Sequence, residues 1–381
     1  TLGRGWYNPE WLGSLIWFEL FELQEEAALQ GGKLLLLFCA WLLLFQLCLR
    51  RGAAPWLTLA LLLLFLPGTA WRFTLRNHLH ALWLIPLYGL ILEQVRRAPS
   101  AHGRRRWLLT LLPVAVLWAN LHASFVVGWL LLAAAALQAW RAGERPSTRD
   151  LILMLSLHPL LGMVSPNGPG NYTQLLDHLH LLSLLRTQIQ EWGGPAQTLT
   201  ATARLPLLLL LFVGPLSFVP RYNRDAPAPL LLLLAGLGLA ALAQRFIPLA
   251  VFLVAPALAV NLTRIMARLS PSPRRMATAV TLAVALLGVF AMSRGARAAA
   301  LVPLLRRPGT PAPAARFLAL NAPAGSRLFN SYNSGPFLLW LAHPAGVRVY
   351  IDPRNHQGEV LLRRYLSELL VSPAAFEREV H

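Results

Sequence analysis

Residues 33–51 read KLLLLFCAWLLLFQLCLRR, and this stretch decides the class of protein. Lys33 on one side and the pair Arg50 and Arg51 on the other enclose residues 34–49, which carry no charge. A helix needs roughly 20 apolar residues to cross the hydrocarbon of a bilayer, and fewer where the membrane is thinner. The stretch therefore predicts a membrane-spanning helix that ends at two arginines.

The composition of the whole chain agrees with a membrane protein. Of its 381 residues, 56% are hydrophobic and 13% are charged, and the mean hydropathy is +0.52. Water-soluble domains carry roughly 25% charged residues. We therefore expect an α-helical integral membrane protein with about ten transmembrane helices. The predicted spans are residues 33–49, 54–70, 79–95, 107–119, 124–140, 151–165, 205–219, 228–244, 247–262 and 276–293.

The arginines test these spans, because positive charge collects in loops on the cytoplasmic side. Up to residue 293, sixteen arginines fall in loops on one predicted side: Arg50, Arg51, Arg96, Arg97, Arg104, Arg105, Arg106, Arg141, Arg145, Arg149, Arg221, Arg224, Arg264, Arg268, Arg274 and Arg275. Six fall on the other side: Arg4, Arg72, Arg76, Arg186, Arg204 and Arg245. The split predicts a multi-pass protein whose first loop and C-terminal tail both lie outside the cytoplasm.

The net charge of +18 therefore reflects membrane topology. The sequence has no basic patch interleaved with aromatic residues, so it does not predict a nucleic-acid partner. The chain is rich in Ala, Gly, Pro and Arg, and Lys33 is its only lysine, which suggests a GC-rich bacterial source. The expected location is the bacterial inner (cytoplasmic) membrane, with the C-terminal domain on the periplasmic or extracellular side. Because the chain begins at Thr1 and its end falls within a helical pattern, we expect an internal fragment.

The spans divide the chain into three predicted parts. Residues 1–32 form an outer loop, in which the amphipathic pattern of residues 10–29 predicts a helix lying in the membrane interface. Residues 33–293 form the transmembrane domain, which includes a long outer loop at residues 166–204. Residues 294–381 form an extramembrane domain that is incomplete.

The C-terminal part has the pattern of a small α/β domain that has only begun. Helical patterns cover residues 314–321 and 337–342, and strand patterns cover Arg327–Asn330 and Val347–Ile351. In a parallel arrangement the ends of both strands share one edge, where Asn333, Asp352 and Arg354 would be candidates for contacting an acceptor. The structural alternative is that Asp352 and Arg354 only pair with each other and close a turn.

Polar residues at the outer ends of the spans are the candidates for binding or chemistry, because polar groups inside a membrane are costly and usually functional. Asn120 and His122 lie in the turn between the fourth and fifth spans, where they either satisfy the broken backbone or bind substrate. Arg245 lies between two abutting spans, where it either reaches to the membrane interface or grips a phosphate with its planar guanidinium.

The remaining candidates share the outer face. Glu10 and Glu191 each stand beside a tryptophan, and Arg72 and Arg76 precede the third span. The simpler interpretation is that the two glutamates are solvated acids of loops and that the two arginines anchor the third span at the lipid head groups. No metal-binding motif, phosphate-binding Gly-rich loop or hydrolase motif occurs, and the two cysteines predict neither a disulfide nor a zinc site. The sequence predicts no cofactor, and it does not decide whether a divalent cation binds.

Several short motifs, in this order, resemble a group of bacterial membrane proteins that looks like the GT-C superfamily of glycosyltransferases. The motifs are Glu-Trp-Leu (10–12), Trp-x-Asn-x-His (118–122), Pro-Asn-Gly (166–168), Glu-Trp (191–192), Arg-Phe-x-Pro (245–248), Phe-Asn-x-Tyr-x-x-Gly (329–335) and Tyr-Ile-Asp-x-Arg (350–354). The resemblance covers nearly the whole chain, and it implies an enzyme that uses sugars linked to polyprenyl phosphate.

The resemblance implies roles for the candidate residues. Glu10 would be an acidic residue of the first outer loop, and the lining of the substrate cavity would comprise Asn120, His122, Glu191, Arg245, Arg72 and Arg76. Enzymes of this superfamily usually carry their catalytic Asp at the end of the first transmembrane helix, which would lie upstream of Thr1. The partners would be membrane lipid and a lipid-linked sugar. Two alternatives stay open from the sequence: a transporter or flippase for a lipid or anionic solute, and a non-catalytic membrane assembly protein.

Overall fold

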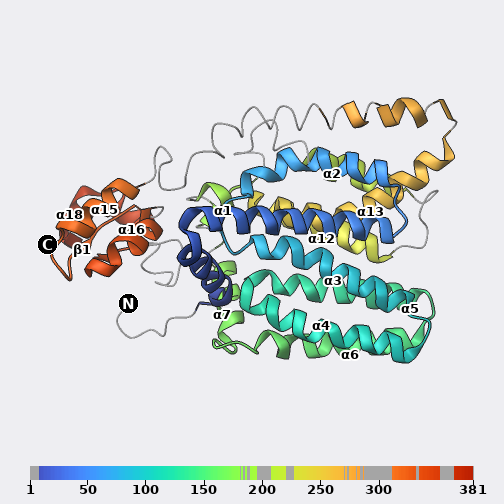
Figure 1. Ribbon diagram of the computed structural model, residues 1–381, viewed down its shortest axis with the longest axis horizontal. Coiled ribbons are helices and arrows are strands. Elements are labelled where there is room, and N and C mark those ends of the chain that lie inside the picture. Colours follow the sequence, from blue (N-terminus) through green and yellow to red (C-terminus); the bar gives the residue numbers. More distant parts are fainter. Residues whose placement is uncertain are drawn as a thin grey trace. The chain divides into compact units, whose positions relative to one another are not determined.

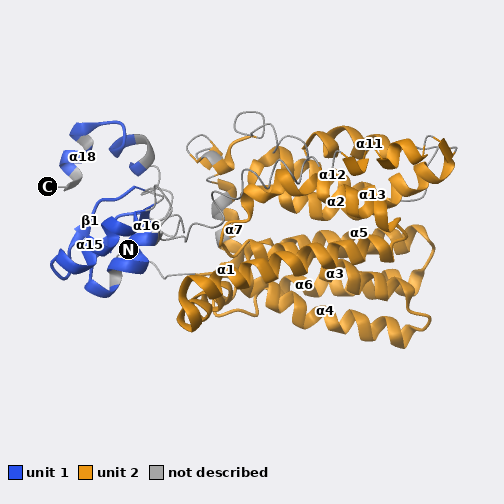
Figure 2. Ribbon diagram, turned by 45° about the horizontal axis from the view of Figure 1, so that its top comes forward, with its two compact units in different colours: residues 1–7, 293–381 blue, residues 8–292 orange. Residues whose placement is uncertain are grey.

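The structure is a computed structural model, and it describes most of the chain in two compact units. The described residues are 8–180, 182, 185–186, 189–194, 207–219, 227–269, 271–272, 274–279, 281–283, 286, 311–331, 334–351 and 364–380. One unit comprises residues 8–292, and the other comprises residues 1–7 and 293–381 (Figure 2). The larger unit holds most of the predicted spans, and it is named the helical unit below.

Long helices lying side by side make up the helical unit (Figure 1). They are α1 Trp11–Arg50, α2 Pro55–Thr69, α3 Leu79–Arg97, α4 Ala101–Leu121, α5 Val127–Arg141, α6 Arg145–Gly162, α12 Pro227–Leu242 and α13 Ile247–Arg268. Shorter elements join them: η1 Ala70–Arg72, η2 Ala123–Val126, α7 Gly170–His180, η3 Gln190–Trp192, η4 Leu209–Val213, α11 Gly214–Ser217 and η5 Gln244–Phe246. The predicted helical class is therefore confirmed.

Among the described residues, four helical segments are long and apolar enough to cross a membrane. They are Trp11–Arg50, Pro55–Arg72, Ala123–Arg141 and Gln244–Arg268. Helix α12 is apolar but has only 16 residues, while α3 and α4 carry charged residues within their length. These segments are consistent with a membrane protein. The figure of about ten spans stays a prediction, and much of the span predicted at residues 276–293 lies outside the described residues.

Burial in the helical unit also suits a hydrocarbon surrounding. Leu34 and Phe38 on α1 are 63% and 65% exposed, whereas the charged side chains of Arg72 and Glu93 are buried. In water the exposed leucine and phenylalanine side chains would form a large apolar surface, whereas the buried charges are ion-paired inside the protein. Helix α13 is apolar and mostly buried from Ile247 to Val260, as expected of a central helix, and its last turns, which carry Arg264 and Arg268, are not buried.

The helical unit has two chemically different ends. Arg97 donates a hydrogen bond to the carbonyl of Arg50, and Arg104 pairs with Asp150 at 3.3 Å. These contacts bring the α1–α2, α3–α4 and α5–α6 connections together at one end, named here the basic end. Helix α4 has 21 residues, and its length of about 30 Å separates the basic end from the opposite end, named here the polar end.

Helix α1 differs from the prediction in where it breaks. The sequence predicts an interfacial helix over residues 10–29 and a separate span from residue 33, whereas α1 runs from Trp11 to Arg50 and kinks at Gln24 and Glu25. Glu25 has φ 47°, a conformation that is costly for a residue with a side chain. The helix continues through Gly31 and Gly32, so residues 30–32 do not separate the interfacial helix from the span.

The C-terminal unit contains less strand than predicted. It comprises α15 Ala312–Asn321, β1 Arg327–Leu328, α16 Gly335–Ala342, η8 His343–Ala345, β2 Arg348–Val349, η9 Tyr365–Leu369 and α18 Pro373–Val380. β1 and β2 pair in parallel but have two residues each. Beyond them the Asn330 side chain accepts hydrogen bonds from the backbone of Tyr350 and Ile351, so a side chain replaces further strand pairing. An α/β domain here stays a prediction.

Candidate functional site

At the polar end, three arginines converge on the carboxylate of Glu191. Arg72 Nη1 lies 2.5 Å from Glu191 Oε2, Arg76 Nη1 lies 2.9 Å from the same oxygen, and Arg245 Nη1 lies 3.3 Å from Oε1. The side chain of Arg72 is 4% exposed, whereas that of Arg76 is 50% exposed. The cluster therefore extends from the protein interior to its surface.

Short turns between the helices position these four side chains. Arg72 closes η1 after α2, Arg76 lies in the turn before α3, and Arg245 lies in η5 between α12 and α13. Glu191 belongs to η3, which is tied to η5 by the hydrogen bond from Gln244 N to the carbonyl of Gly193. The guanidinium of Arg245 also stacks 4.2 Å from the ring centroid of Trp192, which fixes its plane.

Among the described residues, the cluster sets three positive charges around one negative charge. Burial raises the pKa of Glu191, but the positive charges of Arg245, Arg72 and Arg76 outweigh it and hold the pKa below its ordinary value. Glu191 is therefore ionised at neutral pH, and three guanidinium groups surround one negative charge. In addition, Arg72 Nε is buried and makes no hydrogen bond with the residues that the structure describes. The Nε of Arg72 is therefore a donor that an anion can use.

A second group of polar side chains centres on Glu10. Its carboxylate lies 3.2 Å from His122 Nε2 and accepts a 3.1 Å hydrogen bond from Asn77 Nδ2. Glu10 precedes the first turn of α1, and His122 ends α4 with an extended backbone. A side chain at Gly13 would meet Asn77 Oδ1 at 2.8 Å, so glycine is needed where α1 approaches the turn before α3. The Glu10 side chain remains 33% exposed.

Hydrogen bonds indicate the tautomer of His122. Its Nδ1 accepts a 3.0 Å hydrogen bond from the backbone N–H of Ser124, which leaves the proton on Nε2, facing Glu10. Burial, with Arg245 and Arg72 nearby, lowers the pKa of His122 to about 3. The contact with Glu10 is therefore a hydrogen bond from a neutral imidazole to a carboxylate, and not an ion pair.

The two groups are neighbours. Arg245 and Arg72 are close enough to His122 to depress its pKa, and His78 Nε2 lies 2.7 Å from the carbonyl of Arg72. A carboxylate that can accept a proton thus lies near a set of guanidinium groups that can hold an anion. The polar-end site below means Glu10, Arg72, Arg76, Asn77, His122, Glu191 and Arg245.

Asn120 lies beside this site and has a structural role. Its Oδ1 accepts a 2.6 Å hydrogen bond from Trp11 Nε1, and its Nδ2 donates to the carbonyls of Val116 and Val164. These bonds join the start of α1 to α4 and to the end of α6. Asn120 also lines an open groove of about 620 Å³, whose other walls include Pro113 and Leu117 on α4.

The structure thus brings seven of the sequence-based candidates to one end of one unit, six of them within the polar-end site. Asn333, Asp352 and Arg354 lie outside the described residues, so their expected role stays a prediction. The sequence analysis missed Asn77 and Ser14, whose side chains share a 3.0 Å hydrogen bond. The only signal for Asn77 was its place between Arg76 and His78, because a lone amide has no distinctive pattern.

No metal centre appears in the part of the chain that the structure describes, where no group of three or more His, Cys, Asp or Glu side chains could hold a metal ion. The chain matches no family model, no curated protein sequence and no solved structure. The polar-end site is therefore interpreted from its own geometry.

The neutral state of His122 predicts a dependence of stability on pH. Because the pKa of His122 is lower in the folded protein than in the unfolded chain, the unfolded chain binds the proton more tightly. The free energy of unfolding is therefore unaffected by this group above about pH 6.5, and it falls as the pH drops from there toward 3. We expect the free energy of unfolding at pH 5.0 to be about 2 kcal/mol lower than at pH 7.5 because of this group. In His122→Gln that part of the loss should disappear, as measured by thermal unfolding in detergent.

The matched control is His102→Gln, which changes an exposed histidine at the basic end. This variant should keep the pH dependence of the unaltered protein. If His122→Gln instead steepened the loss at acid pH, the His122–Glu10 contact would be a true ion pair, and the assignment of a neutral imidazole would be wrong.

Proposed function

We propose that this chain is a membrane glycosyltransferase, similar to the GT-C superfamily, that transfers a sugar from a polyprenyl-phosphate donor. The observation that carries the proposal is the convergence of Arg72, Arg76 and Arg245 on a single carboxylate at the polar end. Arginine binds phosphate through paired hydrogen bonds, and the buried Nε of Arg72 makes no hydrogen bond with the described residues. A lipid phosphate would accept from this donor and from the guanidinium groups around it.

The proposed reaction uses Glu10 as the general base. An acceptor hydroxyl gives its proton to the Glu10 carboxylate while its oxygen forms a bond to C1 of the sugar. The bond from C1 to the phosphate oxygen breaks, and the electron pair leaves with the polyprenyl phosphate. Arg72, Arg76 and Arg245 stabilise the negative charge that develops on that phosphate. Asn77 and His122 hold the Glu10 carboxylate in place and leave part of it exposed to an acceptor.

The groove beside Asn120 supports a lipid substrate. It follows α4 from Asn120 at the polar end to Pro113, and its walls are mainly apolar. The two residues are seven positions apart, which corresponds to about 10 Å along a helix. A polyprenyl chain could therefore lie along α4 with its phosphate near the arginines.

The proposal extends to topology. We propose about ten spans, with the polar end and a small α/β domain on the periplasmic or extracellular side of the bacterial inner membrane. The grouping of the α1–α2, α3–α4 and α5–α6 connections at the basic end supports this orientation, since positive loops favour the cytoplasm.

Cysteine labelling would test the orientation. In a protein with Cys39 and Cys48 replaced by alanine, Pro169→Cys near the polar end should react with an impermeant maleimide in intact cells, because Pro169 is exposed. His102→Cys at the basic end should react only after the membrane is permeabilised. Labelling of His102→Cys in intact cells would overturn the proposed topology.

Replacing Arg245 tests the function itself. Arg245→Lys keeps the charge but loses the planar fork and its stacking on Trp192, so we expect the affinity for polyprenyl phosphate to fall about tenfold or more. Binding can be measured as the stabilisation of the purified protein by added lipid. Arg186→Lys is the matched control, because Arg186 is exposed and outside the cluster. If both variants bound polyprenyl phosphate equally well, Arg245 would be only an anchor at the membrane interface.

A further inference from the structure

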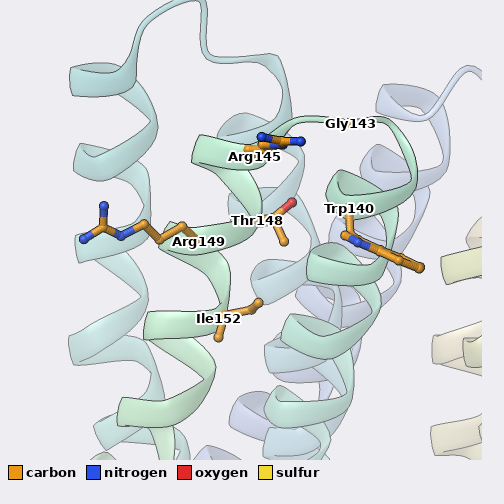
Figure 3. A pocket seen from close by; sticks show the side chains of 6 residues that line it. All are labelled: Trp140, Gly143, Arg145, Thr148, Arg149 and Ile152. Atoms are coloured by element: carbon orange, nitrogen blue, oxygen red, sulfur yellow. The ribbon is translucent and has the colours of Figure 1, made fainter.

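The basic end has a cavity of its own, far along the helices from the polar-end site. It has a volume of about 320 Å³ and lies where α5 turns into α6. Arg145, Thr148 and Ile152 on α6 face Trp140 on α5, while the guanidinium of Arg149 points to the other side (Figure 3). The proposed glycosyl transfer makes no use of this cavity.

Two arginines line the cavity, Arg145 and Arg149, and of these Arg145 lies on the side of Trp140 (Figure 3). Glu93 pairs with Arg96 and Arg97, and Asp150 pairs with Arg104 and Arg105, so both carboxylates are already shared between arginines. Arg145 makes no ion pair with the residues that the structure describes. Its guanidinium is exposed and lies at the rim of the cavity, where an anion can reach it.

Trp140 and Ile152 give the cavity an apolar and open part. Trp140 is 64% exposed and Ile152 is 51% exposed, and on α6 the exposed face continues with Leu153 and Leu157. An exposed tryptophan above a row of aliphatic side chains is the arrangement found where a helix leaves the hydrocarbon and enters the head-group layer. The cavity thus offers a cation on the water side and an apolar surface on the membrane side.

We propose that this cavity binds one anionic glycerophospholipid of the leaflet at the basic end. The phosphate lies at Arg145, and the glycerol and upper acyl carbons lie against Trp140 and Ile152. An anionic head group fits better than a zwitterionic one, because a choline or ethanolamine cation would be held beside Arg145, which makes no ion pair with the described residues. The apolar wall favours a lipid over a free phosphate, which would gain nothing from Trp140.

Native mass spectrometry tests the proposal. The purified protein in a neutral detergent is mixed with equal amounts of phosphatidylglycerol and phosphatidylcholine of different mass, and the retained lipid is counted. We expect one phosphatidylglycerol to be retained in preference. Arg145→Gln should lower its retention about fivefold, the effect of losing one interfacial cation. Trp140→Ala should lower it as well, because the apolar wall is lost.

The matched control is Arg141→Gln, which removes an exposed arginine of the same connection that does not line the cavity. It should retain phosphatidylglycerol as the unaltered protein does, and all three variants should keep its melting temperature. An equal loss in Arg141→Gln would mean diffuse attraction to the basic end and would overturn the proposal. So would displacement of the lipid by millimolar glycerol phosphate, which would indicate a site for a soluble phosphate.

Discussion

Glu10→Gln is expected to slow sugar transfer about 100-fold or more, the usual effect of removing a general base. Glutamine has nearly the same shape, and its Oε1 can still accept one of the two hydrogen bonds from Asn77 and His122, so the protein should still fold. It cannot take the proton of an acceptor hydroxyl. The rate is measured as polyprenyl phosphate released from a polyprenyl-phosphate-linked hexose, with a membrane lipid extract as the source of acceptors.

Glu19→Gln provides the control for this prediction. Glu19 is an exposed acid on the same helix, so the same substitution there should leave both the rate and the melting temperature unchanged. If Glu10→Gln released polyprenyl phosphate as fast as Glu19→Gln, Glu10 would not be the base. In that case the hydrogen bonds around it would serve only to anchor the start of α1.

Glu191→Gln is expected to destabilise the protein by about 3 kcal/mol or more, because it leaves buried charge without a counter-ion. Arg72 has a side chain that is 4% exposed, and its ion partner among the described residues is Glu191. The carboxylate is ionised at neutral pH, so the neutral amide removes a full charge from the centre of three arginines. Thermal unfolding in detergent at neutral pH measures the loss.

Arg76→Gln is the comparison, since Arg76 contacts the same carboxylate but is 50% exposed. A pair at the surface contributes about 1 kcal/mol or less, so this variant should be far less affected. We also expect added polyprenyl phosphate to stabilise Glu191→Gln more than the unaltered protein, because its phosphate can replace the missing negative charge. Equal, small losses in both variants would contradict a buried ion cluster.

The helices of the fold were predictable where the local pattern of apolar and charged residues determines them. Uncharged runs such as residues 34–49 predict helices because no polar group interrupts them. The kink at Glu25 was not predictable, since nothing in the Gln-Glu-Glu run distinguishes it from its neighbours. The short strands were overestimated because strand patterns give no warning that the Asn330 side chain takes over the backbone pairing.

The site was predictable residue by residue but not as an arrangement. Arg72 and Arg245 were candidates because each is a charged residue at the outer end of a span, and Glu191 because it stands beside a tryptophan in the long outer loop. Their convergence depends on how α2, α12 and the η3 turn pack, and the contacting residues lie 119 and 54 positions apart in the chain. No sequence spacing specifies such a contact. Asn77 escaped notice for the same reason, because its importance comes from what α1 places against it.

The central claim is that the arginines of the polar end bind the phosphate of a lipid. A structure of the protein in nanodiscs, determined by electron cryo-microscopy with saturating polyprenyl phosphate, tests it most directly. We predict that the phosphate contacts at least two of Arg72, Arg76 and Arg245 and that the chain follows the groove along α4. A phosphate bound elsewhere, with Glu191 still contacted by all three arginines, would contradict the claim.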